Sequence, residues 1–322
     1  MQPGLVTTII PVYNRAAMLR EAVASVLAQT YRPIEIIVID DGSTDDTAAV
    51  ADELAAAHDA VRVIHQPNKG VGLAREAGRL AARGEFIQHL DSDDVIYPRK
   101  FELQVAGLRA HAECGVSYGW TRGRTNGQLT EAPEYETGRR IETMFPAMLQ
   151  SRIWLTFTPL YRKTLIDRAG AWLPLINEED WEYDARIAAF GVRLHFVQQW
   201  LGEFRQHDGE RLSRRGYVPR VMRDRARAHA LIYEHARRAG IGDEVPEMQH
   251  YARELFLLAR QCGAAGLPSE SRMLFELARE ASGPRGAALA FRIYSAFARV
   301  AGWSAAGKIA TMSDHLRWRR SR

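Results

Sequence analysis

The fold class follows from the stretch Ile34–Thr47, which reads IEIIVIDDGSTDDT. Its first six residues form an apolar run that only Glu35 interrupts, typical of strands that are buried on both faces of a parallel sheet. A turn at Gly42-Ser43 follows, and Thr44 is the predicted N-cap of a helix that ends near Ala57. A buried strand that leads through a short polar loop into a helix indicates the repeating unit of an α/β fold.

The same alternation of strand and helix fills the N-terminal third of the chain. Further strands are predicted at Leu5–Ile10, Val61–Ile64 and Glu85–Leu90, and further helices at Ala16–Gln29, at Gly70–Ala82 and from Pro98 to Ala110. Strands joined by helical crossovers pair in parallel. We therefore predict a mainly parallel central sheet.

The rest of the chain is less regular and then becomes helical. Strands or extended segments are predicted at Val116–Thr121, Thr156–Tyr161 and Arg193–Gln198, helices at Ile141–Gln150 and Glu178–Phe190, a hairpin turn at residues 126–127, and a helical hairpin at Leu255–Glu280. From Val218 onward every segment has helical periodicity. We predict two domains, an α/β domain at residues 1–217 and a helical C-terminal extension at residues 218–322.

Composition excludes several classes of protein. The chain has 322 residues with an ordinary apolar share of 46%, so a disordered or fibrous protein is not expected. Cys114 and Cys262 have no pairing or metal-ligand spacing, which indicates inert thiols in a reducing cytosol. No leader opens the chain, and no apolar run reaches the ~18 residues that span a bilayer. The expected location is the cytoplasm.

Two polar loops follow the first two predicted strands. Ligands of open α/β sheets bind beyond the carboxyl ends of the strands. At the first end, after Pro11, Tyr13 can stack on a nucleotide base and Asn14 can hydrogen-bond it; the alternative is a turn with an incidental aromatic residue. At the second end, the carboxylates of Asp40 and Asp41 can accept the N3–H of uracil, or they can form an Asx-turn and a helix cap. Asp45 and Asp46 are interpreted as acids in the first turn of the next helix.

The most informative motif is HLDSDD (His89–Asp94), directly after the fourth predicted strand. Asp91, Asp93 and Asp94 place three like charges within four residues, which raises their pKa values unless a cation is present. Mg²⁺ and Mn²⁺ take one or two carboxylates together with substrate phosphates. An aspartate at the first position can instead hold ribose hydroxyls, and a solvated loop is the alternative to a site.

Three further groups are candidates for binding or catalysis. Gly70 and Gly72 let backbone amides approach a phosphate, and Arg75 adds a cation, although the missing third glycine argues against a dinucleotide fingerprint. Glu179 and Asp180 open a predicted helix, where the dipole favours ionised acids and where either a helix cap or a general base is possible. His207 can coordinate a metal or contact a diphosphate, or it can be an ordinary loop histidine.

In their order, these motifs closely resemble family 2 glycosyltransferases of the GT-A fold, across roughly residues 5–215. The resemblance implies an inverting transfer of a sugar from a nucleotide diphosphate donor, UDP-linked, to an acceptor hydroxyl, with Mn²⁺ or Mg²⁺ as cofactor. It implies polysaccharide or glycoconjugate biosynthesis with a glycan, lipid-linked or protein acceptor, and no nucleic-acid partner. The alternatives are a non-catalytic sugar-nucleotide-binding protein and a nucleotidyl transferase on a similar sheet.

The resemblance also assigns roles to individual residues. Pro11, Tyr13 and Asn14 correspond to the nucleotide-binding loop, and Asp41, beside Asp40, corresponds to the residue that reads uracil. The D-x-D motif falls on Asp91, Ser92 and Asp93, with Asp91 near the ribose, Asp93 as metal ligand and Asp94 as a second ligand. The remaining roles are Arg75 as the basic residue near phosphate, Asp180 as the base with Glu179 beside it, and His207 near metal and diphosphate. Glu76 departs from the asparagine that many relatives have.

The helical extension gains nothing from the resemblance. Residues 1–202 carry roughly five more acidic than basic residues, and residues 203–322 carry roughly nine more basic than acidic ones. In Gly286–Trp303, the residues Leu289, Ile293, Phe297 and Val300 lie opposite a polar strip of Arg292, Ser295 and Arg299. This helix either faces the core, or it touches anionic lipid together with Trp303 and the RWRRSR tail (Arg317–Arg322), as a peripheral contact at the inner face of the membrane. Docking or homodimer formation through the helical hairpin is a third alternative.

Overall fold

The computed structural model describes residues 1–125, 127–205 and 218–320, and the side chains of residue 287 and residues 313–320 are outside that description. The described residues fall into two compact units. The sheet unit is Met1–Met144, Arg152–Pro174 and Phe190–Gly209, and the helical unit is Phe145–Ser151, Leu175–Ala189 and Glu210–Arg322. Each unit is described by itself. The predicted boundary at residue 217 stays a prediction.

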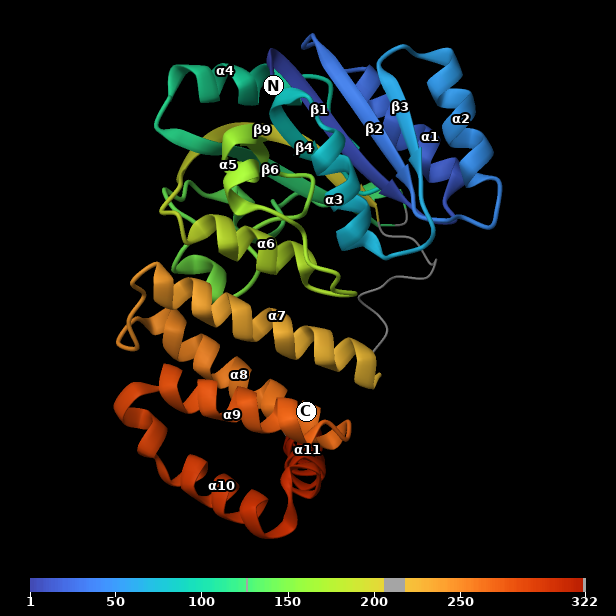
Figure 1. Ribbon diagram of the computed structural model, residues 1–322. Coiled ribbons are helices and arrows are strands. Elements are labelled where there is room, and N and C mark those ends of the chain that lie inside the picture. The colour runs from blue at the N-terminus through green and yellow to red at the C-terminus, as the bar shows by residue number, and fades with distance from the viewer. Residues whose placement is uncertain (126, 206–217, 321–322) are drawn as a thin grey trace. The chain divides into compact units, whose positions relative to one another are not determined.

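The sheet unit is built on one mixed sheet (Figure 1). Among the described residues its strand order is β3-β2-β1-β4-β8-β6-β9-β5, and β7 pairs with β6 at the side. The four strands β3, β2, β1 and β4 are parallel, as predicted. Their bounds are β1 Gln2–Val12, β2 Ile34–Asp40, β3 Val61–His65 and β4 Gly84–His89; the others are β5 Asp94–Ile96, β6 Cys114–Thr125, β7 Gln128–Leu129, β8 Leu160–Arg162 and β9 Arg193–Arg205.

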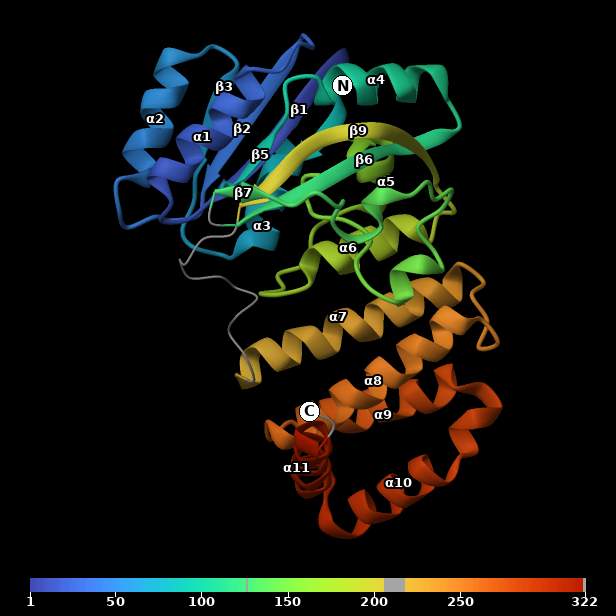
Figure 2. The ribbon, with the colours of Figure 1, turned by 180° about the vertical axis from the view of Figure 1, so that it is seen from behind.

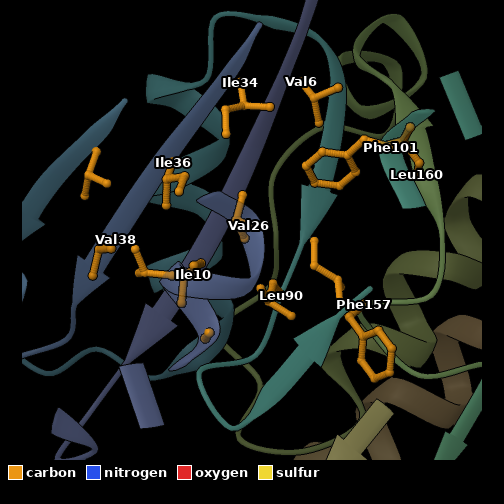
Figure 3. Close-up of a cluster of buried hydrophobic side chains, with 14 of the residues drawn as sticks. Val6, Ile10, Val26, Ile34, Ile36, Val38, Leu90, Phe101, Phe157 and Leu160 are labelled. Atoms are coloured by element: carbon orange, nitrogen blue, oxygen red, sulfur yellow. The ribbon is translucent and has the colours of Figure 1, made fainter. Parts of the chain in front are cut away.

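Helices cover both faces of the parallel strands. On one face, Ile36 and Val38 of β2 belong to a buried cluster that also contains Val26 and residues of the second and fourth helices (Figure 3). Because successive strand residues point to opposite faces, the neighbouring Ile9 and Ile39 face the third helix, and Figures 1 and 2 show the sheet from its two sides. The helices are α1 Ala16–Leu27, α2 Thr47–Ala57, α3 Val71–Ala81, α4 Lys100–Ala110, α5 Lys163–Ala169 and the 3₁₀ turn η1 Tyr135–Gly138.

The helical unit follows the predicted pattern. Its elements are η2 Ala147–Leu149, α6 Glu179–Ala188, α7 Pro219–Arg238, α8 Pro246–Ala264, α9 Pro268–Ala281, η4 Gly283–Ala287, α10 Leu289–Ala301 and α11 Trp303–Arg320. The predicted hairpin is confirmed, because α8 and α9 pack against each other across residues 265–267. Proline at the first position of α7, α8 and α9 suits a helix start, where its missing N–H would have no partner.

Several local predictions were wrong. Residues Ile141–Gln150 form no α-helix and contain only the short η2 turn, because Pro146 lacks an N–H and disfavours helix at the residue before it. The extended segment at Thr156–Tyr161 is a strand only from Leu160 onward. Helix α2 begins at Thr47 with Asp46 as the preceding residue, so Thr44 is no N-cap, and Asp45 and Asp46 stand before the first turn.

The C-terminal helices correct two expectations about single residues. Trp303 packs against the rings of Phe275 and Tyr294, with centroids 5.2 and 6.0 Å apart, so this half-buried residue contacts the core of the helical unit. Leu289, Ile293, Phe297 and Val300 of α10, which a core-facing helix would bury, are exposed. Cys114 and Cys262 are both buried, and burial raises the pKa of Cys262 to about 12. No helix among the described residues is long and apolar enough to cross a membrane.

The contact between α3 and the sheet can be tested at Gly78. A Cβ atom at this position would lie 2.9 Å from Ile39 Cδ1 and would also meet Ile9, and both isoleucines are fully buried. Helix propensity alone predicts that Gly78→Ala stabilises the protein by up to about 1 kcal/mol. We expect the opposite sign, a loss of about 1–3 kcal/mol in the free energy of unfolding from overpacking.

Urea unfolding followed by circular dichroism measures this change. Leu80→Ala on the same helix is the control, because Leu80 is 70% exposed and its truncation should change the stability by less than about 0.5 kcal/mol. Stabilisation by Gly78→Ala would contradict the close packing of α3 on the sheet.

Candidate active site

The first two loops at the carboxyl ends of the parallel strands are tied together by Asn14. Its side-chain Oδ1 accepts a hydrogen bond from the backbone N–H of Thr44 (2.8 Å), and its Nδ2 donates to Thr44 Oγ1 (3.2 Å). The Ser43 hydroxyl accepts a third bond, from the Asn14 N–H. Asn14 adopts a left-handed backbone with φ 51°, which asparagine tolerates better than most residues. Its amide therefore holds the two loops in register.

The ring of Tyr13 projects from this joined pair of loops. Pro11 is buried within β1 opposite Ile39, so it anchors the strand end. Tyr13, two residues later, is 45% exposed. An aromatic ring on a fixed loop at a sheet edge is suited to stacking on a flat base.

Asp41 shapes the segment that leads into α3. Its carboxylate accepts hydrogen bonds from Gln66 Nε2 (2.7 Å), from the Lys69 N–H (2.9 Å) and from the Gly70 N–H (2.8 Å). Asp41 is buried, and these three donors offset the loss of water around its charge. A carboxylate has about four acceptor positions, so about one remains for a ligand.

Asp40, the neighbour of Asp41, forms its hydrogen bonds with other residues of the protein. Its oxygens accept from the Ser43 N–H and lie 3.0 Å from His65 Nδ1, while His65 Nε2 lies 3.0 Å from Asp52. Burial by itself raises the pKa of Asp40, but the bonds from Ser43 and His65 outweigh it and lower the pKa below its ordinary value. Asp40 therefore stays ionised and fixes the turn after β2.

The acid loop Asp91–Asp94 follows β4 at the same edge of the sheet. Arg75 of α3 donates to Asp91 Oδ1 at 2.7 Å, and Arg15 forms an ion pair with Asp93. Ser92 is buried between them. Arg205, the last described residue of β9, donates through Nε to the backbone oxygen of Asp93 at 2.8 Å. Three arginines from three elements thus surround the acid loop.

Asp94 is the acid with the least compensation. It is buried at the start of β5, and burial, followed by the charges of Asp93 and Asp91, raises its pKa well above the ordinary value, although Arg205 opposes this. The predicted effect of neighbouring carboxylates is therefore present at Asp94, where burial contributes more to the raised pKa. Such a loop gains stability from any additional positive charge.

The acid loop has the chemistry of a divalent-cation site without complete coordination. No group of three or more His, Cys, Asp or Glu side chains with metal-binding geometry occurs among the described residues. The carboxyl oxygens of Asp93 and Asp94 do fit Mg²⁺ or Mn²⁺, which commonly bind through one or two carboxylates plus substrate phosphates. His207, the third predicted ligand, lies outside the described residues.

A buried layer behind the loop holds Arg75 in place. Its guanidinium lies 5.0 Å from the centroid of the Trp172 ring, and that ring also packs edge-on against His89. Glu76 accepts from the Trp172 N–H (3.1 Å) and from Arg79. Glu76, the one departure from the family pattern, therefore faces this supporting layer. Trp172 was not predicted, because only the folded chain brings it near Arg75.

In the helical unit, Glu179 and Asp180 open helix α6, as predicted, and both are buried. The Trp181 N–H donates to Asp180 Oδ1 at 2.8 Å, and Trp181 Nε1 donates to the backbone oxygen of Met148 at 3.1 Å. The ionised form of Asp180 is favoured at a helix N-terminus. The first turn of α6 thus presents two adjacent acids on a fixed backbone.

Three side-chain contacts, two of Glu178 and one of Glu182, connect the start of α6 to α7, and none of them was predicted. Glu178 lies 2.9 Å from Arg225 Nε and 3.0 Å from His229 Nε2, and Glu182 lies 3.1 Å from His235 Nε2. Burial raises the pKa of Glu178, but His229 and then Arg225 outweigh it and lower the pKa to about 2. Glu178 directly precedes Glu179, and Glu182 follows two residues after Asp180. The contacts of Glu178 and Glu182 therefore fix the position of both acids relative to α7.

The sequence has recognisable relatives. Residues 7–168 match the family described as glycosyl transferase family 2. The chain is 27% identical over 282 residues to the uncharacterized glycosyltransferase EpsJ of Bacillus subtilis (strain 168), across 83% of this chain and 80% of that protein. It is 41% identical over 99 residues to the glycosyltransferase GlyG of Streptococcus pneumoniae serotype 4, across 30% of this chain and 33% of GlyG.

Solved structures with the same fold are also known. TarS 1-349 of S. aureus in complex with UDP-GlcNAc aligns with a TM-score of 0.72 at 21% identity, covering 96% of this chain and 92% of that one. The mannosyltransferase PcManGT from Pyrobaculum calidifontis, in complex with GDP-Man and Mn²⁺, aligns with a TM-score of 0.53 at 20% identity, covering 97% and 86%. These likenesses confirm the predicted α/β fold of the GT-A type.

The ion pairs of Glu178 give a prediction with a defined pH dependence. Because the folded-state pKa lies below the ordinary 4.5, the charge of Glu178 contributes stability above pH 4.5, and this contribution is lost as the pH falls toward 2. Glu178→Gln should lower the free energy of unfolding at pH 7 by about 3–5 kcal/mol, since it leaves buried cations without their partner.

Urea unfolding at a series of pH values measures the difference between Glu178→Gln and the unaltered protein, which should narrow below pH 4.5. Glu234→Gln is the matched control on α7, because its pair with Arg238 is exposed and worth only about 0.3–0.5 kcal/mol. Equal effects of the two substitutions would show that the buried pair does not fasten α6.

Proposed function

The chain belongs to glycosyl transferase family 2, and on this premise we propose that it transfers a sugar from a nucleoside diphosphate donor, UDP-linked, to an acceptor hydroxyl with inversion. The observation that carries the proposal is the location of Tyr13, Asp41, Arg75 and the acid loop at one edge of the sheet. These side chains match the chemical parts of such a donor, which are a flat base, a ribose and a charged diphosphate.

The base is the part that Tyr13 and Asp41 would recognise. Tyr13 offers an exposed ring for stacking, and Asp41 retains about one acceptor position after its three internal hydrogen bonds. An acceptor opposite the N3–H favours uracil over cytosine, because cytosine has no hydrogen at N3. This polarity supports a UDP-linked donor.

The ribose and diphosphate are assigned to the acid loop and its arginines. Asp91, which Arg75 orients, is assigned to the ribose hydroxyls. Asp93 and Asp94 would hold the divalent cation, which when bound would neutralise charge on the leaving diphosphate. Arg15 now pairs with Asp93, so we expect this arginine to release Asp93 when the donor and the cation bind.

The catalytic base is assigned to Asp180. At the start of α6 its carboxylate is held by the Trp181 N–H, and the helix dipole favours its ionised form. Asp180 would accept the proton of the acceptor hydroxyl as the oxygen attacks the anomeric carbon from the side opposite the diphosphate. This single displacement needs no covalent enzyme intermediate. A glycan, a lipid-linked saccharide or a protein would all supply the hydroxyl.

Donor binding is tested by calorimetric titration of UDP with and without Mn²⁺. We expect binding that depends on the metal and that weakens at least about tenfold in Asp93→Ala, a change of about 1.4 kcal/mol. Asp52→Ala is the control, because Asp52 is an exposed acid that contacts only His65 among the described residues. Absence of binding to UDP, GDP and dTDP under both conditions would refute the donor assignment.

Catalysis is tested by transfer assays with Asp180→Asn. The substitution keeps the shape of the side chain and removes its basicity, so the rate should fall about 100- to 10,000-fold while UDP affinity stays unchanged. Glu179→Gln is the matched control at the neighbouring residue, and its transfer rate should fall much less. If Asp180→Asn keeps the full transfer rate and Glu179→Gln loses it, the catalytic base is Glu179. Binding of donor without turnover in the unaltered protein would favour a non-catalytic sugar-nucleotide-binding protein.

A further inference from the structure

Helix α10 exposes one continuous apolar face. Val300 is 90% exposed, Leu289 68%, Ile293 59% and Phe297 40%. Their spacing of three and four residues places them on one side of a helix with 3.6 residues per turn. We call these four residues the α10 apolar face. Scattered exposed apolar residues are common, but an aligned row of large ones marks an interaction surface.

The α10 apolar face is not the surface that holds α10 to the protein. The opposite side of the helix does this, where Tyr294 and Ala298 are buried. The Tyr294 ring stacks on Phe275 of α9 with centroids 5.6 Å apart, and Phe291 stacks on Phe256 of α8 at 4.8 Å. Packing within the helical unit therefore buries one side of α10, and the described residues of this unit leave the α10 apolar face exposed.

The charged residues within the segment that contains this helix are all of one sign, whereas Glu276 and Glu280 of α9 line the hollow beside Arg292 and Arg299. Residues 282–312 contain Arg285, Arg292, Arg299 and Lys308 but no aspartate or glutamate. All four cations are exposed, and none of them forms an ion pair with a described residue. In the neighbouring helix α9, the exposed Arg279 pairs with Glu276.

The cations are arranged along one edge of the α10 apolar face. Arg292 and Arg299 each precede a residue of that face, Ile293 and Val300, and they are seven residues apart, which is about two helical turns. The helix thus has three sides, one buried, one basic and one exposed and apolar. An apolar side bordered by arginine is the pattern of helices that lie in the interface of a bilayer.

We infer that α10 docks this protein onto an anionic lipid surface, with the α10 apolar face at the acyl boundary and Arg292 and Arg299 at the lipid phosphates. The charges favour lipid over a second copy of the chain. In a two-fold dimer in which the two α10 helices run antiparallel, the basic edges would meet, and residues 282–312 supply no acid to neutralise them. The inference goes beyond the proposed function and does not depend on the donor or the acceptor.

The test is flotation of the full chain with phosphatidylcholine vesicles, with and without phosphatidylglycerol. We expect flotation with phosphatidylglycerol only, and less of it at high salt, because salt screens the attraction. Arg292→Gln with Arg299→Gln should weaken binding about 30-fold. Ile293→Glu with Val300→Glu should abolish binding. Leu80→Glu is the control and should bind like the unaltered protein, because Leu80 is a similarly exposed leucine on α3.

The substituted residues are exposed, so circular dichroism and urea unfolding should be unchanged and would show that any loss is not unfolding. Light scattering of each protein measures whether it forms a dimer, because a second copy of the chain is the alternative to lipid. Failure of the unaltered protein to float with either vesicle overturns the inference. So does a different result, in which the unaltered protein is a dimer that binds no vesicle and the double variant Ile293→Glu, Val300→Glu is a monomer. If the double variant Arg292→Gln, Arg299→Gln floats as well as the unaltered protein, the assigned role of the arginines is also overturned.

Discussion

A carboxylate that is taken out of water needs hydrogen-bond donors or a cation, and this requirement organises the edge of the sheet where the candidate site lies. Asp41 obtains three N–H donors by drawing the segment before α3 toward β2. Asp40 obtains the Ser43 N–H and His65 by closing the turn after the same strand. The course of both loops follows from the needs of two buried acids.

The same constraint sets the acid loop after β4 and the start of α6. Arg75 and Arg15 reach Asp91 and Asp93 from separate elements, and Arg205 arrives from a strand far along the chain. In the helical unit, Glu178 is held by His229 and Arg225. Each acid that the structure buries therefore determines which distant segment must come near it, and the functional candidates sit among acids placed in this way.

The sequence predicted those parts of the fold whose physical cause is local. The run Ile34–Ile39 is buried on both faces because it is apolar at every position but Glu35, and β2 forms where that pattern predicts it. Glu35 is buried with hydrogen bonds from Thr7 and Arg83. The helical hairpin of α8 and α9 was likewise predicted from periodicity and a Gly-Leu-Pro break. Ile141–Gln150 failed because the apolar pattern outweighed the proline within it. Periodicity also could not tell which side of α10 is buried, since both sides contain large apolar residues.

The acids of the site and Arg75 were predicted, and the other partners of the acids were not. Asp40, Asp41 and the acid loop stand at strand ends, so their common location followed from parallel strand order. Arg15 and Trp172 act across long sequence distances, and no motif marked them. The roles of Asp93, Asp180 and the other assigned residues stay predictions, and His207 lies outside the described residues.

The hydrogen bonds of Asn14 to Thr44, and of Asp41 to Lys69 and Gly70, have a thermodynamic consequence. They fix three loops in the folded chain before any ligand arrives, so the conformational entropy of those loops is lost during folding. A ligand that binds a preorganised surface loses little further entropy to ordering it. Association at this edge of the sheet should then be limited by encounter more than by rearrangement, and the affinity should reside mainly in the rate of dissociation.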